Sequence, residues 1–275
     1  MNVKNLKNRV VLITGAGSGM GRATALACAR RGAQLAICDM NEAGLKETAE
    51  DARALGAEVL AQTVDVSDTD EMDEFADAVH ARFDTVDLLI NNAGIGVGAG
   101  FFDTTPQDWD RQLAVNLMGV VHGCERFIPP MIERGTGGQV VNVASSAGYA
   151  AIPAMFAYSV TKFATFGFSE ALRIEMRRHK IGVTTICPGL INTAITRTSV
   201  MRGDHADERA ARVARLYERR GYTPERAADN ILRAAGRNRA VAPVTPEAHF
   251  LYALTRIAPP VARWFSARTS AVLAK

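Results

Sequence analysis

The stretch Val10-Val11-Leu12-Ile13-Thr14-Gly15-Ala16-Gly17-Ser18-Gly19-Met20-Gly21 joins a short apolar run to a glycine-rich turn. Consecutive large apolar residues predict a strand that is covered on both faces, as strands of a parallel sheet are. Glycine tolerates positive φ and lets another group approach the backbone closely. A helical pattern over Gly19–Arg31 begins within the turn itself. The stretch therefore predicts a strand, a tight turn and a helix in direct succession.

Short apolar runs and longer helical patterns alternate along the rest of the chain. The predicted strands are Val10–Ile13, Leu35–Cys38, Val59–Thr63, Leu88–Ile90, Gln139–Val143, Gly182–Ile186 and Ala240–Val244. The predicted helices are Gly19–Arg31, Glu42–Leu55, Thr69–Phe83, Trp109–Glu133, Phe156–Lys180 and Pro224–Gly236. This alternation predicts a Rossmann-like, doubly wound parallel sheet of about seven strands with helices on both faces. Pro129-Pro130 are expected to kink or end the fourth helix.

Composition bounds the class of protein. The 275 residues, 48% of them hydrophobic, suffice for a globular α/β domain with a sizeable core. No apolar run reaches the length of a membrane span, and the first residues lack the apolar core of a signal peptide. The four cysteines are scattered and form no Cys-x-x-Cys pair, so we expect reduced thiols in a cytoplasmic protein and no metal site.

Charge is distributed unevenly. Residues 197–275 carry 15 basic and 7 acidic residues, although the whole chain has a net charge of only +3. A solvated arginine-rich surface is the simplest interpretation, and attraction to an acidic substrate or an anionic membrane surface is the alternative. Nucleic acid is not an expected partner, because the basic residues lack interleaved stacking aromatics.

The glycine turn predicts a dinucleotide site. A helix N-terminus offers unpaired N–H groups and a positive dipole end to a pyrophosphate, and this turn follows a strand and opens a helix. Asp39 ends the second predicted strand, where a carboxylate can accept hydrogen bonds from ribose hydroxyls and would repel a 2′-phosphate. Ser18 and Met40 supply no cation to offset that repulsion. NAD is therefore expected rather than NADP.

Two further turns are expected at the same edge of the sheet, because ligands gather at the carboxyl ends of parallel strands. Asp65-Val66 end the third predicted strand, where an adenine edge could be met. Asn91-Asn92-Ala93-Gly94 end the fourth, and their small residues would let a cofactor lie against the backbone.

Tyr158 and Lys162 stand four residues apart on a predicted helix, so both lie on one face. A neighbouring ammonium favours the phenolate, which would lower the tyrosine pKa from its usual value near 10. The pair is therefore a candidate general acid/base near neutral pH. Ser145 follows the fifth predicted strand and could stabilise charge that develops on a substrate oxygen.

In this order and spacing, the motifs resemble the short-chain dehydrogenase/reductase family in its common single-domain form. The resemblance covers roughly residues 5–245. It rests on the following residues: Thr14–Gly21, Asp65, Asn91–Gly94, Asn116, Ser145, Tyr158–Lys162 and Pro188-Gly189. It implies one dinucleotide-binding and catalytic domain over 1–275, with a substrate lid at 190–222 and a C-terminal extension at 246–275.

The resemblance also implies residue roles. Tyr158 would be the catalytic acid/base, and Lys162 would hold the nicotinamide ribose and lower the tyrosine pKa. Ser145 would hydrogen-bond the substrate oxygen, and Asn116 would hold a water in a proton relay. The remaining cofactor-binding residues would be Gly15, Ser18, Gly19, Met20, Gly21, Asp39, Asp65, Val66, Asn92, Ala93, Gly94, Pro188, Gly189, Ile191 and Thr193.

These expectations predict an NAD-dependent oxidoreductase that interconverts a secondary alcohol and a ketone. Apolar residues in the lid segment favour a lipophilic substrate. The alternatives are an NADPH-dependent 3-oxoacyl reductase and a catalytically idle dinucleotide sensor or scaffold. The helices Trp109–Glu133 and Phe156–Lys180 resemble the family's dimer-forming pair, so a homodimer or homotetramer is expected. The C-terminal tail mixes aromatics with arginines, which suits a subunit interface or peripheral contact with a membrane.

Overall fold

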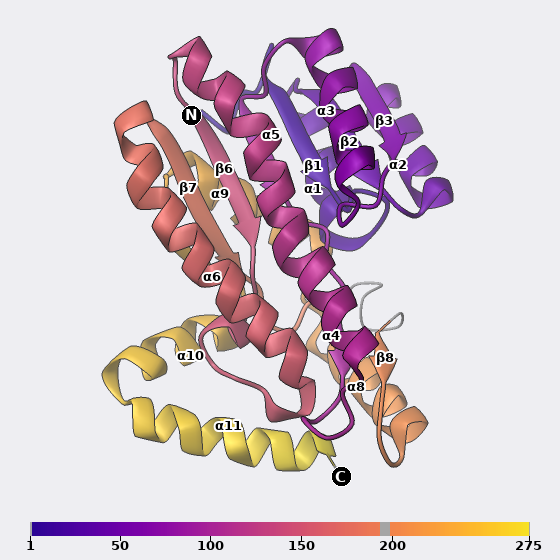
Figure 1. Ribbon diagram of the computed structural model, residues 1–275, viewed down its shortest axis with the longest axis vertical. Coiled ribbons are helices and arrows are strands. Elements are labelled where there is room, and N and C mark those ends of the chain that lie inside the picture. Colours follow the sequence, from indigo (N-terminus) through magenta and orange to yellow (C-terminus); the bar gives the residue numbers. More distant parts are fainter. Residues whose placement is uncertain (1, 193–198, 275) are drawn as a thin grey trace.

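The computed structural model describes residues 2–192 and 199–274, with side chains described up to Arg215 and again from Gly221 to Arg268. A seven-stranded sheet runs through its centre in the order β3-β2-β1-β4-β6-β7-β9, and every pairing is parallel (Figure 1). The strands are β1 Val10–Thr14, β2 Gln34–Asp39, β3 Val59–Thr63, β4 Leu88–Asn91, β6 Gly138–Val143, β7 Ile181–Cys187 and β9 Val241–Pro243. The predicted doubly wound sheet is confirmed.

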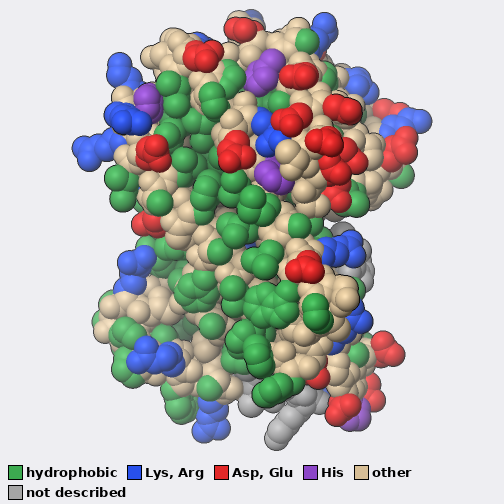
Figure 2. Space-filling model, viewed as in Figure 1, with side chains coloured by type: hydrophobic (Ala, Val, Ile, Leu, Met, Phe, Trp, Pro, Cys, Tyr) green, Lys and Arg blue, Asp and Glu red, His purple; other side chains and the backbone are tan. Residues whose placement is uncertain are grey.

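Helices cover both faces of the sheet. One hydrophobic core joins it to α1 Gly19–Ala29, α2 Glu42–Ala54 and α9 Pro224–Gly236. A second core joins it to α3 Thr69–Phe83, α5 Gly119–Arg134 and α6 Phe156–Met176. Figure 2 shows hydrophobic side chains gathered over α5 and α6 on the viewed face. All four cysteines are buried and free, as the sequence predicted.

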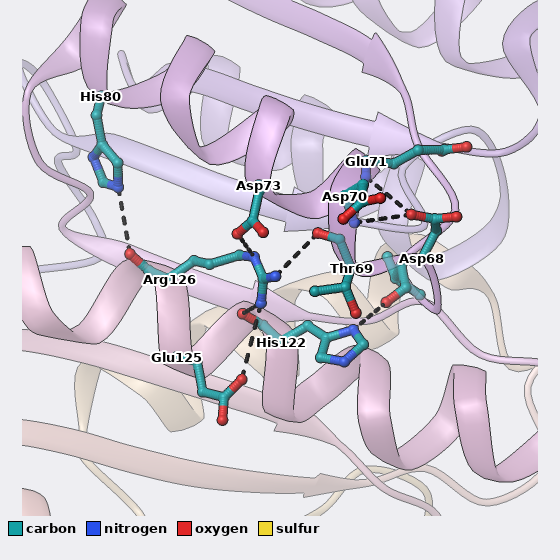
Figure 3. Close-up of polar contacts among 10 residues, drawn as sticks. Asp68, Thr69, Asp70, Glu71, Asp73, His80, His122, Glu125 and Arg126 are labelled. Atoms are coloured by element: carbon teal, nitrogen blue, oxygen red, sulfur yellow. Dashed lines mark hydrogen bonds and ion pairs between the residues drawn. The ribbon is translucent and has the colours of Figure 1, made fainter.

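The fourth predicted helix is three elements in the structure. It begins earlier, as α4 Pro106–Leu113, because Thr105 and Asp108 form a reciprocal capping box. A π-helical turn, η1 Ala114–Met118, then leads into α5. The prolines do not end the helix, which continues to Arg134. Pro130 leaves the Arg126 carbonyl without its usual N–H, and a ring nitrogen of His80 lies 3.4 Å from that carbonyl (Figure 3).

Apart from α9 and β9, the described elements that follow β7 lie at the end of the molecule where β7 terminates (Figure 1). A small parallel pair joins β5 Val97–Gly98 to β8 Val200–Met201. The remaining helices are α8 Ala206–Arg220, α10 Pro246–Ile257 and α11 Pro259–Ala274. α11 packs against α10, α8 and the short 3-10 turn η3 Pro153–Met155 (Figure 1). Within the described residues, no helix combines the length and apolarity needed to cross a membrane.

Candidate active site

The glycine turn lies between the carboxyl end of β1 and the first turn of α1. Gly15 and Gly19 have φ values of +67° and +52°. A Cβ on Gly21 would lie 2.0 Å from the Gly15 carbonyl oxygen, so only glycine fits there. The N-cap, Ser18, makes no side-chain cap hydrogen bond, and the first turn of α1 holds no acidic residue. The first turn of α1 is thus left uncapped and without a repelling carboxylate, which fits a pyrophosphate.

The end of β4 is tied to this turn. The Asn92 side chain donates to the carbonyls of Thr14 and Gly15 at 3.0 and 3.1 Å. The Thr14 hydroxyl accepts from the backbone N–H groups of Asn92 and Ala93, each at 3.0 Å. β1 and β4 are neighbours at the point where the strand order reverses, which is where such sheets bind ligands. Asn92 and Thr14 thus join the β4 loop to the glycine turn. The sequence analysis assigned no separate role to Thr14.

Asp39 faces the glycine turn. One carboxylate oxygen accepts from the Gly17 N–H and the other from the Asn41 N–H, both at 2.8 Å. Asn41, whose side chain accepts from the Gly44 N–H at 3.2 Å, is the cap of α2. Asp39 is therefore not the cap of α2, and its carboxylate is held against the glycine turn.

The turn after β3 is fixed by α5. Asp65 accepts from the backbone N–H and hydroxyl of Ser67 at 2.9 and 2.6 Å. The Val66 carbonyl lies 3.0 Å from His122 Nδ1. In Figure 3, Arg126 on the same helix reaches α3, where it bonds Asp73 and the carbonyl of Thr69. These contacts tie the turn after β3, and the start of α3, to α5.

Asn116 lies in the π-helical turn and is fully buried. Its amide oxygen accepts from the Ile95 N–H at 2.9 Å, and its amide nitrogen donates to the Ile95 carbonyl at 3.0 Å and to the Thr161 hydroxyl at 3.1 Å. A Cβ on Gly94 would lie 3.2 Å from that amide oxygen and 3.4 Å from Lys162 Nζ. The Asn116 side chain therefore fixes the backbone beside Gly94, and the Asn116 carbonyl accepts from the Thr165 hydroxyl at 2.9 Å.

Tyr158 and Lys162 lie on the first turns of α6, as their spacing predicted. The tyrosine ring is half-buried, and its phenol hydrogen-bonds with the Ser145 side chain. Ser145 also accepts from the Ala147 N–H at 3.1 Å, which orients its hydroxyl at the end of β6. Lys162 is 4% exposed, donates to the Val143 carbonyl at 3.0 Å, and has its Nζ 5.7 Å from the tyrosine ring centre. The structure thus brings together the three side chains.

Burial dominates the electrostatics of this group. It lowers the pKa of Lys162 to about 8 and raises the pKa of Tyr158 above its ordinary value. The hydrogen bond from Ser145 opposes the rise in the tyrosine pKa. The sequence analysis expected Lys162 to lower the tyrosine pKa. Within the protein chain itself, burial instead raises the pKa of Tyr158. Tyr158 is consequently a neutral phenol at neutral pH, the form that donates a proton.

The loop after β7 approaches the same edge. The Pro188 carbonyl accepts from the Ser146 N–H at 2.8 Å, and Ile191 is buried. A Cβ on Gly189 would lie 2.2 Å from the Thr245 hydroxyl, so the start of α10 packs directly on this loop. Thr193 lies outside the described residues.

An ion pair that the sequence analysis missed joins β8 to α4. Arg202 donates from Nε and a terminal nitrogen to the two oxygens of Asp108, at 3.1 and 3.0 Å. Arg209 on α8 donates to the Arg202 carbonyl at 3.0 Å. The Thr-Pro-Gln-Asp pattern at 105–108 is a capping-box signature, which could have located Asp108 at the start of a helix.

Three comparisons place the chain among known proteins. The EphD protein of Mycobacterium tuberculosis, described as a probable oxidoreductase, is 43% identical over 259 residues, which cover 92% of this chain and 44% of EphD. The chain thus spans less than half the length of this relative. Macaca fascicularis estradiol 17-beta-dehydrogenase 11 is 37% identical over 193 residues, which cover 69% of this chain and 64% of that protein.

The structure of a short-chain dehydrogenase/reductase from Burkholderia phymatum in complex with NAD superposes with a TM-score of 0.85 at 31% identity. The match covers 94% of this chain and 96% of that one. The family model for short chain dehydrogenases matches residues 9–202, which include the glycine turn, Asn116, Ser145, Tyr158 and Lys162. The chain belongs to the short-chain dehydrogenase family.

Proposed function

We propose that the protein uses NAD to interconvert a lipophilic secondary alcohol and the corresponding ketone. The observation that carries this proposal is the half-buried Tyr158 phenol, hydrogen-bonded with Ser145 and one helical turn from the buried Lys162. The three side chains lie at the carboxyl edge of the sheet, beside the glycine turn and the Asn92 loop. A protein that only bound a dinucleotide would not need a proton donor there.

The chain's own residues handle the proton. A nicotinamide dinucleotide bound at the glycine turn would accept or deliver the hydride. In ketone reduction, the Tyr158 hydroxyl donates its proton to the carbonyl oxygen, and the Ser145 hydroxyl hydrogen-bonds the same oxygen as its charge grows. Alcohol oxidation is the reverse and needs the phenolate, which the cationic ring of a bound oxidised nicotinamide would favour against the burial that raises the Tyr158 pKa. Lys162 would hold the ribose next to Tyr158, with Asn116 keeping the backbone around Gly94 in place.

Asp39 supports the choice of NAD. Its carboxylate accepts from the backbone of the glycine turn, so it lies where a ribose attached to the pyrophosphate would pass. A 2′-phosphate there would meet a like charge. The neighbouring Met40 is 59% exposed and offers no counter-charge.

Aromatic side chains near Tyr158 support a lipophilic substrate. Phe156 precedes the tyrosine by two residues, and its ring centre lies 5.2 Å from that of Phe101 and 6.2 Å from that of Trp109. Segment 190–222, which includes β8 and α8, would cover this region as a lid. A relative that carries the name of an estradiol dehydrogenase fits a substrate of this class.

The decisive experiment follows absorbance at 340 nm with NAD or NADP and two matched groups of secondary alcohols, one of sterols and long-chain alkanols and one of short polyols. We expect turnover of the first group with NAD. Turnover of short polyols alone would refute the lipophilic substrate. Turnover only with NADPH and a 3-oxoacyl thioester would favour a 3-oxoacyl reductase, and NAD binding without any hydride transfer would favour a sensor.

A homo-oligomer is part of the same proposal. The outer face of α6 exposes Val160, Phe163 and Ile174, the last of them 78% exposed, at helical spacing. Gly167 lies among them, and a Cβ there would meet nothing within 4 Å, which lets a second helix approach closely. Met118, the last residue of η1 before α5, is also exposed. This face of α5 and α6 fits a second copy of the chain.

A further inference from the structure

The hairpin of α10 and α11 carries a dense group of exposed large apolar side chains. These are Phe250, Ile257, Val261, Trp264 and Phe265, with exposed fractions of 56%, 84%, 51%, 59% and 38%. All of them fall within sixteen residues, 250–265, whereas scattered single exposed apolar residues are normal on a protein surface. A group this concentrated indicates an interaction surface.

The apolar side chains form one face. On α11, Val261, Trp264 and Arg268 recur at spacings of three and four residues, which places them along one side of the helix. The Phe265 ring centre lies 6.3 Å from that of Phe250, so the exposed sides of α10 and α11 are continuous. Ala262, which is 3% exposed, points the opposite way, into the body of the protein. We call this face, made by Phe250, Ile257, Val261, Trp264 and Phe265, the hairpin face.

Arginines are interleaved with these apolar residues. Arg256, Arg263 and Arg268 are exposed, and residues 248–275 contain no acidic residue. The Arg256 guanidinium lies 4.4 Å from the Tyr252 ring centre, and that of Arg268 lies 5.2 Å from the Trp264 ring centre. Figure 2 shows hydrophobic and basic side chains adjoining over α10 and α11 at the lower left. The hairpin therefore combines a cationic charge with exposed aromatics.

We propose that the hairpin face docks on the surface of an anionic lipid bilayer. Trp264, Phe265 and Ile257 would enter the boundary between headgroups and acyl chains, while the arginines contact anionic headgroups. A second copy of the chain fits less well. A two-fold contact brings the same patch against itself, so the arginines of each copy would meet arginines, with no carboxylate in 248–275 to neutralise them.

Docking would turn the catalytic end of the molecule toward lipid. α11 packs against η3, which leads directly into α6 and Tyr158. β5 also packs against η3, and Phe102, which follows β5, is 96% exposed. A lipophilic alcohol could therefore pass between bilayer and site over a short path. This last link rests on the proposed substrate class, whereas the docking surface stands without it.

The test is flotation of the full-length protein with vesicles of phosphatidylcholine alone or with about one third phosphatidylglycerol. We expect binding to the anionic vesicles only, weakening as salt rises. Arg263→Glu should weaken vesicle binding about tenfold or more, because it removes a basic contact and adds a charge that anionic headgroups repel. Ile257→Glu should weaken binding by a similar factor, because it replaces an exposed apolar side chain with a carboxylate. Leu55→Glu, just after the end of α2, and Arg177→Glu, just after α6, change exposed residues and are the matched controls, which should bind as the wild type does.

Other results would overturn the proposal. Absence of binding to either vesicle would do so, as would binding that Ile257→Glu and Arg263→Glu leave unchanged. Loss of a dimer or tetramer in Ile257→Glu, seen by light scattering, without vesicle binding of the wild type would show that a second copy covers the hairpin face. Because flotation does not depend on turnover, its outcome is separate from that of the alcohol assay.

Discussion

Lys162 donates to the Val143 carbonyl at 3.0 Å, while its ammonium lies 5.7 Å from the centre of the Tyr158 ring. The lysine is therefore anchored to the end of β6 rather than to the phenol. Its burial lowers its own pKa to about 8 and the burial of Tyr158 raises the phenol's pKa, so the pair alone favours the neutral tyrosine. The helical spacing places Tyr158 and Lys162 next to each other, whereas their burial sets the direction in which each pKa shifts.

Tyr158→Phe should reduce kcat by about 10²- to 10⁴-fold, which is the usual contribution of a positioned general acid or base. The ring remains, so binding of NAD, followed by fluorescence titration, should change little. Tyr149→Phe is the matched control, because the Tyr149 hydroxyl donates to the Ala248 carbonyl at 2.7 Å and faces α10. Equal losses in the two variants would contradict the role given to Tyr158.

Lys162→Met should abolish turnover and weaken NAD binding, yet raise the free energy of unfolding near pH 7. The folded-state pKa of Lys162 is lowered to about 8 from 10.5, so the unfolded chain binds more protons between these values. Wild-type stability from this group therefore rises with pH across that window, by up to about 3 kcal/mol.

Urea denaturation of both proteins at pH 7 and pH 10 checks this expectation. The stability advantage of the methionine variant should shrink as pH rises. The buried thiols act in the opposite direction, because burial raises their pKa, but they are present in both proteins and largely cancel in the difference. If the difference in unfolding free energy between the two proteins stayed constant from pH 7 to pH 10, burial of the Lys162 charge would not be the cause of the variant's greater stability.

Asp39→Ala should raise kcat/KM with NADP by about 10-fold or more and lower it with NAD. The carboxylate repels a 2′-phosphate and can bond the ribose hydroxyls, so its removal acts on both cofactors in opposite directions. Initial rates at 340 nm give the ratio. Asp51→Ala on α2, which removes a carboxylate paired with Arg22 at 2.7 Å, should leave the ratio unchanged. A parallel loss with both cofactors would instead indicate damage to the glycine turn.

Phe163→Glu combined with Ile174→Glu should convert the proposed homo-oligomer to a monomer. Each introduces a charge on the exposed apolar face of α6, where two copies would desolvate it. Light scattering after size exclusion gives the mass. Leu55→Glu, at an exposed apolar position just after α2, should retain the wild-type mass. A wild-type monomer, or an oligomer that survives the double change, would assign the interface elsewhere.

Arg202→Ala should raise KM for the alcohol several-fold with little effect on NAD affinity. Arg202 links β8 to Asp108 on α4, whereas the glycine turn lies at another part of the sheet edge. Arg202→Lys should recover only part of the loss, because an ammonium cannot reproduce the paired bonds of a guanidinium. A change confined to the KM for NAD would argue against a link between this ion pair and the substrate side.

The elements that the sequence predicted well are those whose signal is local. β1 and β7 are buried along their whole length, and both consist mainly of β-branched residues. β5 and β8 have two residues each, too few for any periodicity, and neither was predicted. The π-helical turn depends on bonds between Asn116 and Ile95, which are 21 residues apart. The pKa directions of Tyr158 and Lys162 likewise follow from burial by distant segments.

Asp108 accepts hydrogen bonds from Thr105 as well as from Arg202. One of its oxygens accepts from the Thr105 N–H at 3.1 Å and hydroxyl at 2.8 Å, and these contacts belong to α4 alone. If β8 moved away, the Asp108 carboxylate would still accept the two hydrogen bonds from Thr105. The Arg202 side chain, which is already 43% exposed, would become solvated by water. Neither the carboxylate nor the guanidinium would then be buried without a polar partner. The contact between Arg202 and Asp108 can therefore break and re-form without leaving either charge without a polar partner.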